Sequence, residues 1–243
     1  MINSVRNTVL AVLNKNNYGY ISPSDFNLFA KQAQLDIFDT YIYSYNNQIN
    51  KENARVSGTE YADITKTIEE VLDTFSVTNT LSQSSSNVYF LPSVTTTGDD
   101  YYLLNKVLCS SSGSFRGEAE KVSHSKITML NSSMLTAPSL TYPAYTQEGA
   151  TITIYPSTFN GASDVSAQYI RYPKDPKWTY VSIGAGEPVF DQTQSDYQDF
   201  ELPIEDEPKL VAKILQYAGI SIREPEAYQF GKIEEQTQSQ QEQ

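Results

Sequence analysis

The sequence predicts an α+β protein in which N- and C-terminal helices form one bundle and an antiparallel β-domain, a sandwich or barrel, is inserted between them. Apolar residues recur at helical spacing in the first third of the chain and again near its C-terminus. Between these regions, turn residues separate short runs of β-branched and aromatic residues, which is typical of strands. Neither helical group is large enough to bury a good core alone, so we expect the two to pack together.

The predicted divisions of the chain follow these changes in composition. They are a helical part of the bundle at 1–76, the β-domain at 77–200, helices that complete the bundle at 201–233 and a flexible Gln-rich tail at 234–243.

The first third of the chain predicts three helices. The first is short and amphipathic, over about 5–14. The second begins at the sequence SPSD, because Ser22 can cap a helix, Pro23 suits the first helical position and Asp25 complements the helix dipole. A third helix is predicted over about 59–75.

The second helix is apolar on two sides. One stripe is Phe26, Phe29, Ala33, Ile37 and Tyr41, and the other, at heptad spacing, is Leu28, Leu35 and Ile42. A helix with two apolar faces needs more than one neighbour. It therefore belongs either at the centre of a bundle or at an interface between subunits.

The middle of the chain predicts strands bounded by turn residues and prolines. We expect them at about 86–92, 100–109, 121–130, 151–156, 165–172 and 178–183, with a long irregular loop at 131–148. The sequence YPKDPKW that follows Arg171 allows two interpretations. Trp178 either covers the end of the domain from a rigid corner, or projects on a loop that docks on a partner.

Helical periodicity returns after an acidic run. Pro208 lies near the start of the predicted C-terminal helix, and Gly219 is its expected C-cap. A second short helix is expected from Pro225, before the Gln-rich tail.

Composition narrows the classes of function. Lys and Arg number 17 and Asp and Glu 29, which gives a net charge of −12 in 243 residues. Such a chain is unsuited to wrapping nucleic acid. No apolar run has membrane-spanning length, and a secretory signal is not expected. The lone Cys109 and the lone His124, the latter on an expected strand, are interpreted as structural residues. The 18 tyrosines suggest extensive half-buried or interfacial surface.

The segment NKNNYGYISPSD, 14–25, has the spacing of a calcium-binding loop. Asp25 is its only carboxylate, however, and Tyr18 stands where an oxygen ligand is needed. A helix–turn–helix joint is the better interpretation. Neither a phosphate-binding glycine motif nor a G-x-S-x-G nucleophile motif is present. We therefore expect no catalytic residue, no cofactor and no metal site.

Several segments together resemble structural proteins of tailed bacteriophages, most closely the neck or ring proteins of crAss-like phages. These segments are ISPSDFNLFAKQAQLDIFDTY, TAPSLTYPAYTQEGATITIYPSTF, VSAQYIRYPKDPKW and DFELPIEDEPKLVAKILQYAGISIREPEAYQF. The order of helices, β-domain and helices is also similar to that of podovirus head-to-tail adaptors. The likeness rests on general sequence style over about 3–233 and not on a catalytic signature.

The resemblance implies a virion protein, assembled in the bacterial cytoplasm, that forms a homo-oligomeric and dodecameric ring. The ring would lie beneath the portal, contact other neck or tail ring proteins, and continue a channel through which double-stranded DNA passes without sequence-specific binding. No membrane is involved. The candidate residues for the subunit or portal interface are Phe26, Leu28, Phe29, Leu35, Ile42, Tyr172, Trp178, Tyr228 and Phe230.

Two alternatives remain open. The chain could be a peripheral tail or fibre-attachment protein whose β-domain binds other virion proteins. The weaker alternative is an enzyme or a lectin-like binding module with an unrecognised site.

Overall fold

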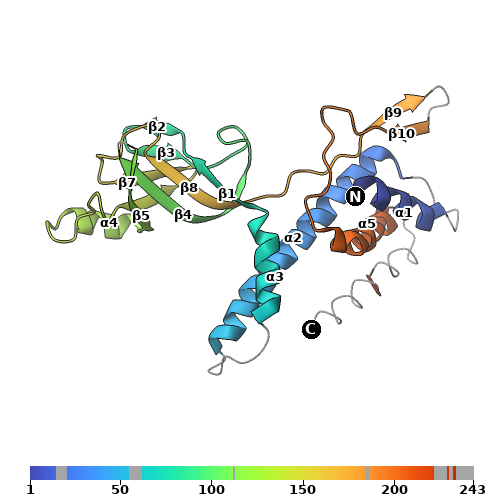
Figure 1. Cartoon of the computed structure of the whole chain (residues 1–243), viewed down its shortest axis with the longest axis horizontal. Coiled ribbons are helices and arrows are strands. Elements are labelled where there is room, and N and C mark those ends of the chain that lie inside the picture. The colour runs from blue at the N-terminus through green and yellow to red at the C-terminus, as the bar shows by residue number, and fades with distance from the viewer. Residues whose placement is uncertain are drawn as a thin grey trace. The chain divides into compact units, whose positions relative to one another are not determined.

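The computed structural model of the chain describes residues 1–14, 21–54, 62–111, 113–183, 187–221, 229 and 232–233. The protein is mixed α/β, with a large curled β-sheet and helices (Figure 1). It divides into two compact units. We name Leu72–Tyr172 the β-unit, and Met1–Val71 together with Pro173–Gln243 the helical unit.

The helical unit contains the helices from both ends of the chain and a two-stranded hairpin. Its elements are α1 (Ile2–Asn14), α2 (Pro23–Ala54), α3 (Ala62–Asp73, which ends in the β-unit), β9 (Tyr180–Ile183), β10 (Glu187–Phe190), the 3₁₀ turn η1 (Ile204–Asp206) and α5 (Glu207–Ser221). Helix α5 contacts both α1 and α2. Among the described residues, none of these helices combines the length and the apolar character needed to span a bilayer.

The predicted start of α2 is confirmed. The backbone N–H of Asp25 donates to the Ser22 hydroxyl oxygen over 3.1 Å, and the N–H of Phe26 donates to the Ser22 carbonyl over 2.9 Å. Pro23 occupies the first helical position, where no hydrogen-bond donor is needed. These contacts satisfy N–H groups that the first turn of a helix otherwise leaves unpaired.

Helix α2 packs its apolar side into the core and fastens the chain that precedes α5. Buried Gln34 donates to the carbonyl of Lys174 over 2.8 Å and accepts from the N–H of Glu201 over 3.1 Å. The Tyr41 hydroxyl donates to buried Asp206 over 2.7 Å. The core of the unit is completed by apolar side chains of all three long helices, which include Val5, Val9, Ala33, Phe38, Leu210, Ile214 and Leu215.

The β-unit is built on one eight-stranded sheet with the order β1-β8-β4-β5-β6-β7-β3-β2. The strands are β1 (Ser76–Thr80), β2 (Gln83–Ser85), β3 (Val88–Phe90), β4 (Tyr101–Ser111), β5 (Ser114–Lys121), β6 (Ala144–Glu148), β7 (Thr151–Tyr155) and β8 (Val165–Arg171), and the helix α4 (His124–Asn131) follows β5. The two edge strands, β1 and β2, are joined by only Leu81 and Ser82, so the sheet must curl until its edges meet.

The curl encloses the core of the β-unit. Fully buried Tyr89, Phe159 and Tyr169 lie there with smaller side chains from the strands, among them Leu81, Val107, Cys109, Ile152, Ile154, Val165 and Ala167. Of the two predicted forms, sandwich or barrel, the single curled sheet excludes the sandwich and is closer to the barrel. It is also not wholly antiparallel, because β5 and β6 pair in parallel.

Several local predictions are wrong. The segment predicted as a strand over 121–130 contains the helix α4, and the predicted loop over 131–148 contains the strand β6. Gly219 lies inside α5, so it does not cap that helix. The short helix expected from Pro225 falls mainly outside the described residues.

The boundary of the β-unit also differs from the predicted one. We expected the β-domain to extend over 77–200, whereas residues 173–200 group with the helices. The physical reason is a set of backbone contacts made by two amide side chains of α2. Gln34 holds the chain at Lys174, and Asn27 exchanges two hydrogen bonds with the backbone of Trp178.

Candidate docking surfaces

Trp178 is buried within the helical unit, with 2% of its surface exposed. The Arg6 guanidinium lies 3.8 Å from its ring centroid, and its indole N–H donates to the side-chain oxygen of Asn3 over 3.1 Å. Its backbone N–H donates to the side-chain oxygen of Asn27 over 2.8 Å. Tyr180 and Phe190 of the hairpin stack with the ring at centroid distances of 5.6 and 5.9 Å. Trp178 therefore forms the rigid corner, and the alternative of a projecting docking loop is wrong for this residue.

The candidate residues of α2 separate into buried and exposed groups. Phe26 and Ile42 belong to the core of the chain itself. Phe29 and Leu35 are half-buried, and Phe29 stacks on a ring of α5. Leu28 is 64% exposed and thus remains available to a partner.

Three other candidate residues lie outside α2. Tyr228 and Phe230 lie outside the described residues. Tyr172, at the end of the β-unit, is 42% exposed and packs edge-to-face on Tyr102, with ring centroids 5.2 Å apart. Tyr172 also lines a hollow of the described β-unit.

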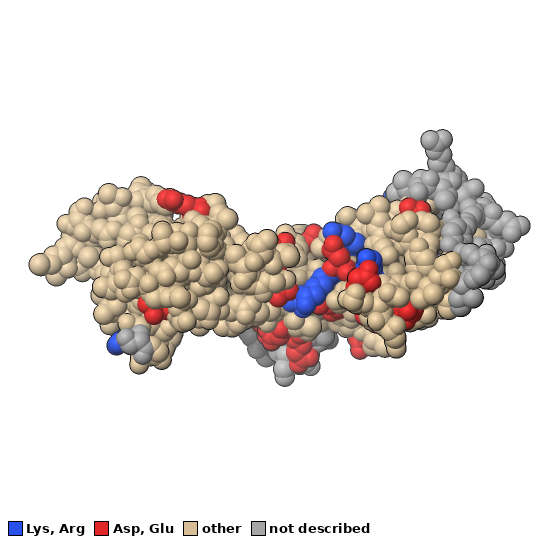
Figure 2. Space-filling view, turned by 90° about the horizontal axis from the view of Figure 1, so that it is seen from above, with Lys and Arg blue, Asp and Glu red and all other residues tan. Residues whose placement is uncertain are grey.

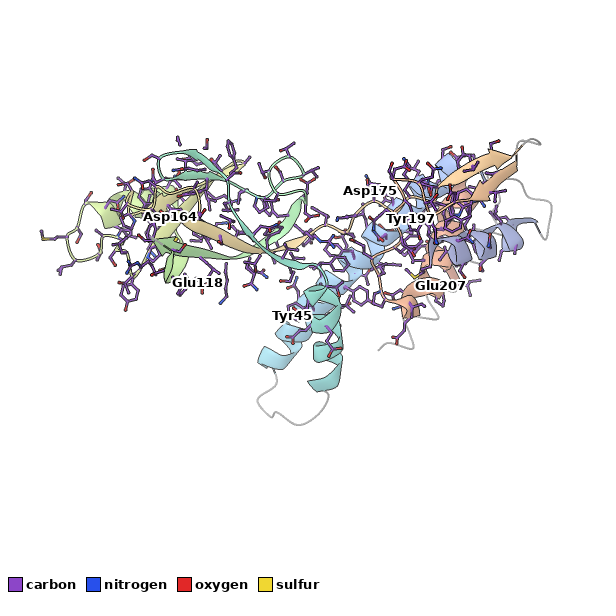
Figure 3. The ribbon with its side chains drawn as sticks, turned by 45° about the horizontal axis from the view of Figure 1, so that its top comes forward. Tyr45, Glu118, Asp164, Asp175, Tyr197 and Glu207 are labelled. Atoms are coloured by element: carbon purple, nitrogen blue, oxygen red, sulfur yellow. The ribbon has the colours of Figure 1, made fainter. Side chains whose placement is uncertain are left out.

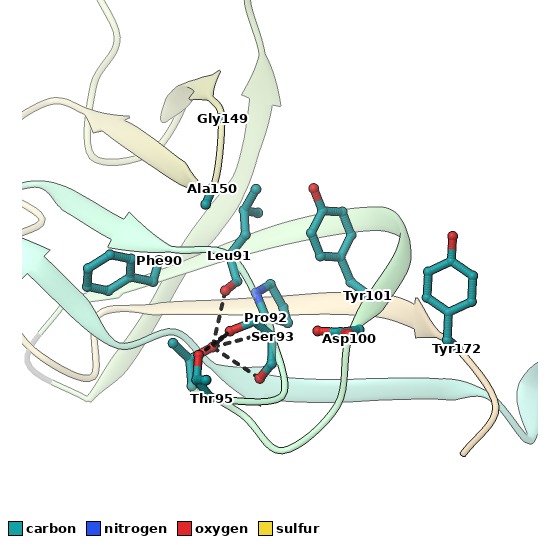
Figure 4. Close-up of a pocket in the computed structure, with 11 residues that line it drawn as sticks. Phe90, Leu91, Pro92, Ser93, Thr95, Asp100, Tyr101, Gly149, Ala150 and Tyr172 are labelled. Carbon is teal, nitrogen blue, oxygen red and sulfur yellow. Dashed lines mark hydrogen bonds between the residues drawn. The ribbon is translucent and has the colours of Figure 1, made fainter. Parts of the chain in front are cut away.

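This hollow is an open depression of about 620 Å³ in the β-unit (Figure 4). The loop between β3 and β4, the turn between β6 and β7, and Tyr172 form its walls. Its lining is Phe90, Leu91, Pro92, Ser93, Thr95, Thr96, Asp100, Tyr101, Gly149, Ala150 and Tyr172. Asp100 is the single charged residue of this lining.

Hydrogen bonds within the wall fix the shape of the hollow. The Thr96 hydroxyl donates to the carbonyl of Leu91 over 3.2 Å, and the carboxylate of Asp100 accepts from the N–H of Val94 over 2.9 Å. The Tyr101 hydroxyl accepts from the amide of Gln147 over 3.4 Å. The hollow thus presents aromatic and hydroxyl groups from a wall whose polar groups bond to one another.

A second surface lies on the last residues of α4 and the segment that follows them. We name Met129–Tyr142 the arm. It carries five exposed large apolar side chains, Met129, Met134, Leu135, Leu140 and Tyr142. Monomeric proteins rarely expose large groups of apolar side chains. Such groups usually mark a surface that contacts a partner.

The arm is ordered by its own hydrogen bonds. The N–H groups of Thr136 and Ala137 donate to the carbonyl of Ser133 over 3.3 and 3.0 Å. Ser139 and Tyr142 exchange two bonds, from the Ser139 N–H to the Tyr142 carbonyl and from the Tyr142 N–H to the Ser139 hydroxyl. The apolar side chains are therefore held on a preformed backbone.

Chemistry of a catalytic or metal-binding kind finds little support in the described residues. They contain no group of three His, Cys, Asp or Glu side chains able to hold a metal. Burial, and then the negative charge of Asp164, raise the pKa of the Cys109 thiol to about 12, so the thiol is protonated at neutral pH. The same two causes raise the pKa of Tyr89 to about 12. Asp164 is labelled in Figure 3.

The single histidine lies at the start of α4. His124 Nδ1 is 3.3 Å from a carboxylate oxygen of Glu148, and both side chains are exposed. On the face seen in Figure 2, charged side chains are sparse and most of the surface belongs to uncharged residues.

Sequence reasoning missed both the arm and the hollow. A signal for the arm was present, because residues 127–147 contain no Asp, Glu, Lys or Arg. No comparable signal existed for the hollow, whose walls come from three separate parts of the chain. No family model matches the chain, and no curated protein matches it in sequence.

Proposed function

We propose that the chain is a virion structural protein that forms a homo-oligomeric ring in the head-to-tail connector of a tailed bacteriophage. The ring lies below the portal, joins the portal to the tail and continues the DNA channel. The observation that carries the proposal is the arm, an ordered and uncharged surface segment with large exposed apolar side chains. Such a surface suits a protein that is covered by neighbours when it works.

The charge of the chain is consistent with this role. A net charge of −12 repels the phosphate backbone, so double-stranded DNA can pass a ring of such subunits without adhering to it. An acidic surface also disfavours binding to an anionic membrane.

The proposal includes one bundle made from helices of both ends of the chain, with its exposed side facing the portal. Contacts of α5 with α1 and α2 support this arrangement. Two hydrogen bonds also support it: the Tyr217 hydroxyl donates to Asp36, and the Tyr41 hydroxyl donates to Asp206. Leu28 is the apolar residue of α2 that such a portal contact would cover.

A second candidate function is a peripheral tail or fibre-attachment protein whose β-unit binds other virion proteins. The observation that favours it is that the arm and the hollow both belong to the β-unit. In that case, portal binding would be absent while binding to a tail or fibre protein would remain.

The test is binding of the full-length chain to purified portal particles of the same virus, measured by co-sedimentation. We expect a ring of this chain to sediment with the portal, and Leu28→Asp to weaken that binding without unfolding the chain. Ser24→Ala, a change at another exposed position of α2, is the matched control. The proposal would be contradicted if the chain did not co-sediment with the portal and lay elsewhere in a reconstruction of the virion.

A further inference from the structure

The arm has the properties of the inserted half of a protein–protein contact. The segment 127–147 has no charged side chain in a chain that is 19% charged, so it can be removed from water without desolvating an ion. Met134 and Leu135 stand fully exposed at the turn in the middle of the arm, which we name the arm tip. Glycine is absent from 118–148, and the turn bonds at Ser133 already order the backbone. Little conformational entropy is then lost on binding.

The hollow has the properties of the receiving half. Its volume of about 620 Å³ is in the range of ligand-binding pockets, which is ~300–1,000 Å³. Phe90, Tyr101 and Tyr172 offer aromatic surface, and Ser93 and Thr95 offer hydroxyls. The one carboxylate of the lining, Asp100, accepts a hydrogen bond from the backbone N–H of Val94. This surface suits an uncharged and apolar guest.

The arm and the hollow lie far apart within one β-unit. Figure 1 shows the arm, beyond α4, at one end of the curled sheet and the loop between β3 and β4 at the other end. One copy therefore cannot fill its own hollow with its own arm. A contact between the two surfaces needs a second copy of the chain.

Other classes of partner suit these surfaces less well. A nucleic acid binds to basic residues. The arm has none, and the net charge of the whole chain is negative. An anionic membrane likewise attracts cationic segments. The hollow has walls of matching, largely uncharged character, whereas a smaller hollow of the β-unit is lined by Lys121 and His124.

We propose that the arm of one copy seats Met134 and Leu135 in the hollow of the next copy, so that successive copies contact head to tail. Because the two halves of the contact are different surfaces, each open assembly of bound copies leaves one arm and one hollow free at its ends. Such heterologous contacts generate rings when the rotation closes. The inference rests on the proposed ring and names the contact that builds it.

Two variants break the contact from its two sides. Leu135→Asp places a charge on the arm tip, and Ala150→Trp fills the hollow from an exposed position of its wall. Each is expected to weaken self-association roughly tenfold or more, as measured by mass photometry and light scattering. The matched controls are Ile204→Asp and Ala162→Trp, which change exposed residues elsewhere and should associate as the unmodified chain does. Circular dichroism and thermal melting establish that all four variants are folded.

Mixing the two variants tests the head-to-tail geometry. The Leu135→Asp chain keeps an intact hollow, and the Ala150→Trp chain keeps an intact arm. A 1:1 mixture should therefore form pairs, joined by one good contact, and nothing larger. As a second measurement, Met134→Cys and Phe90→Cys chains, each carrying a single new thiol, should form a mixed disulfide-linked dimer when diamide is added. Met134→Cys with Ala162→Cys should not.

Any of three assembly results would overturn the inference: a full-length chain that stays monomeric, variants that assemble as well as the unmodified chain, or a variant mixture that forms no pairs. Binding to phosphatidylcholine vesicles that Leu135→Asp abolishes would overturn it too, since the arm would then be a lipid contact. Portal co-sedimentation is scored separately. If the portal is bound but the arm variants assemble normally, this inference fails while the proposed function stands.

Discussion

The guanidinium of Arg6, on α1, lies 3.8 Å from the ring centroid of Trp178, in the segment before the hairpin. The pair joins residues 172 positions apart in the chain, and the Trp178 indole also donates to Asn3 on the same helix. A cation over an aromatic face and a satisfied indole N–H both favour burial of the ring. Trp178 therefore ties the segment before the hairpin to α1 and α2.

Removal of this ring should strongly destabilise the helical unit. We expect Trp178→Ala to lower the free energy of unfolding by ~3–5 kcal/mol, the cost typical of a buried large aromatic side chain. Urea denaturation followed by circular dichroism measures the change. Tyr180→Ala, at a half-exposed ring that stacks on Trp178, should cost clearly less. Equal losses for the two variants would contradict the anchoring role.

Asp199 should make the stability of the helical unit depend on acid pH. Burial alone would raise its pKa, but hydrogen bonds from the N–H of Ile2, the Met1 ammonium and the N–H of Phe200 outweigh burial and lower the pKa below its usual value. The folded state then holds the proton less tightly than the unfolded state. The carboxylate therefore stabilises the fold above the unfolded pKa of ~3.9, and this contribution disappears as pH falls through the lower folded pKa.

The variant Asp199→Asn removes this dependence. It should be less stable than the unmodified chain at pH 7, and the two chains should converge in stability as pH falls below about 4. Denaturant unfolding at several pH values measures the difference. Asp175→Asn, at an exposed carboxylate paired with Lys31, is the control and should change stability by no more than ~0.5 kcal/mol. A difference between Asp199→Asn and the unmodified chain that is constant over this pH range would contradict the argument.

The sequence predicts those elements that local signals specify. Ser22, Pro23 and Asp25 determine where α2 starts without help from the rest of the fold. The strands β4, β7 and β8 were predicted because their β-branched and aromatic residues alternate between turn residues. In each case the signal lies within a few neighbouring residues.

Elements that depend on tertiary partners were missed. Strand β5 has one buried residue, Ala119, and its extended conformation comes from pairing with β4. The eight residues of α4 are too few to separate helical from strand periodicity, and Ile127 is the one that they bury. Local pattern therefore could not assign either segment.

The candidate interface shows the same limit. Phe26 and Trp178 were chosen because they are large and apolar, but an apolar pattern does not tell whether the covering partner is the same chain or another one. Both residues find that partner within the helical unit. The arm was overlooked because its exposed residues are scattered among Ser, Thr and Pro, with neither helical nor strand spacing.

Cys109 should resist thiol reagents in the folded chain. Its side chain is fully buried on β4, and burial followed by the charge of Asp164 raises its pKa to about 12. At pH 8 almost no reactive thiolate exists and the reagent has no access. We expect no colour release from Ellman's reagent by the native protein and one equivalent after denaturation in guanidinium. Rapid stoichiometric reaction of the native protein would contradict the placement of Cys109 in the core.

Gly117, on β5, should be required for the backbone at the end of the arm to lie against the sheet. A methyl group at this position would stand 2.7 Å from the carbonyl oxygen of Thr141 and 3.4 Å from the ring of Pro143. The first distance is too short for real atoms, and the obstacle is backbone that cannot rotate away. We expect Gly117→Ala to lower the free energy of unfolding by ~1–3 kcal/mol, the usual cost of overpacking.

The same substitution should also disturb the arm, since Thr141 belongs to it. Amide hydrogen exchange should therefore rise at Ser139 and Tyr142, whose mutual hydrogen bonds close the end of the arm. Ser114→Ala, at an exposed position on the same strand, is the control and should leave both stability and exchange unchanged. If Gly117→Ala left exchange in the arm unaltered, the arm would not depend on its contact with β5, and its order would come from its internal turns alone.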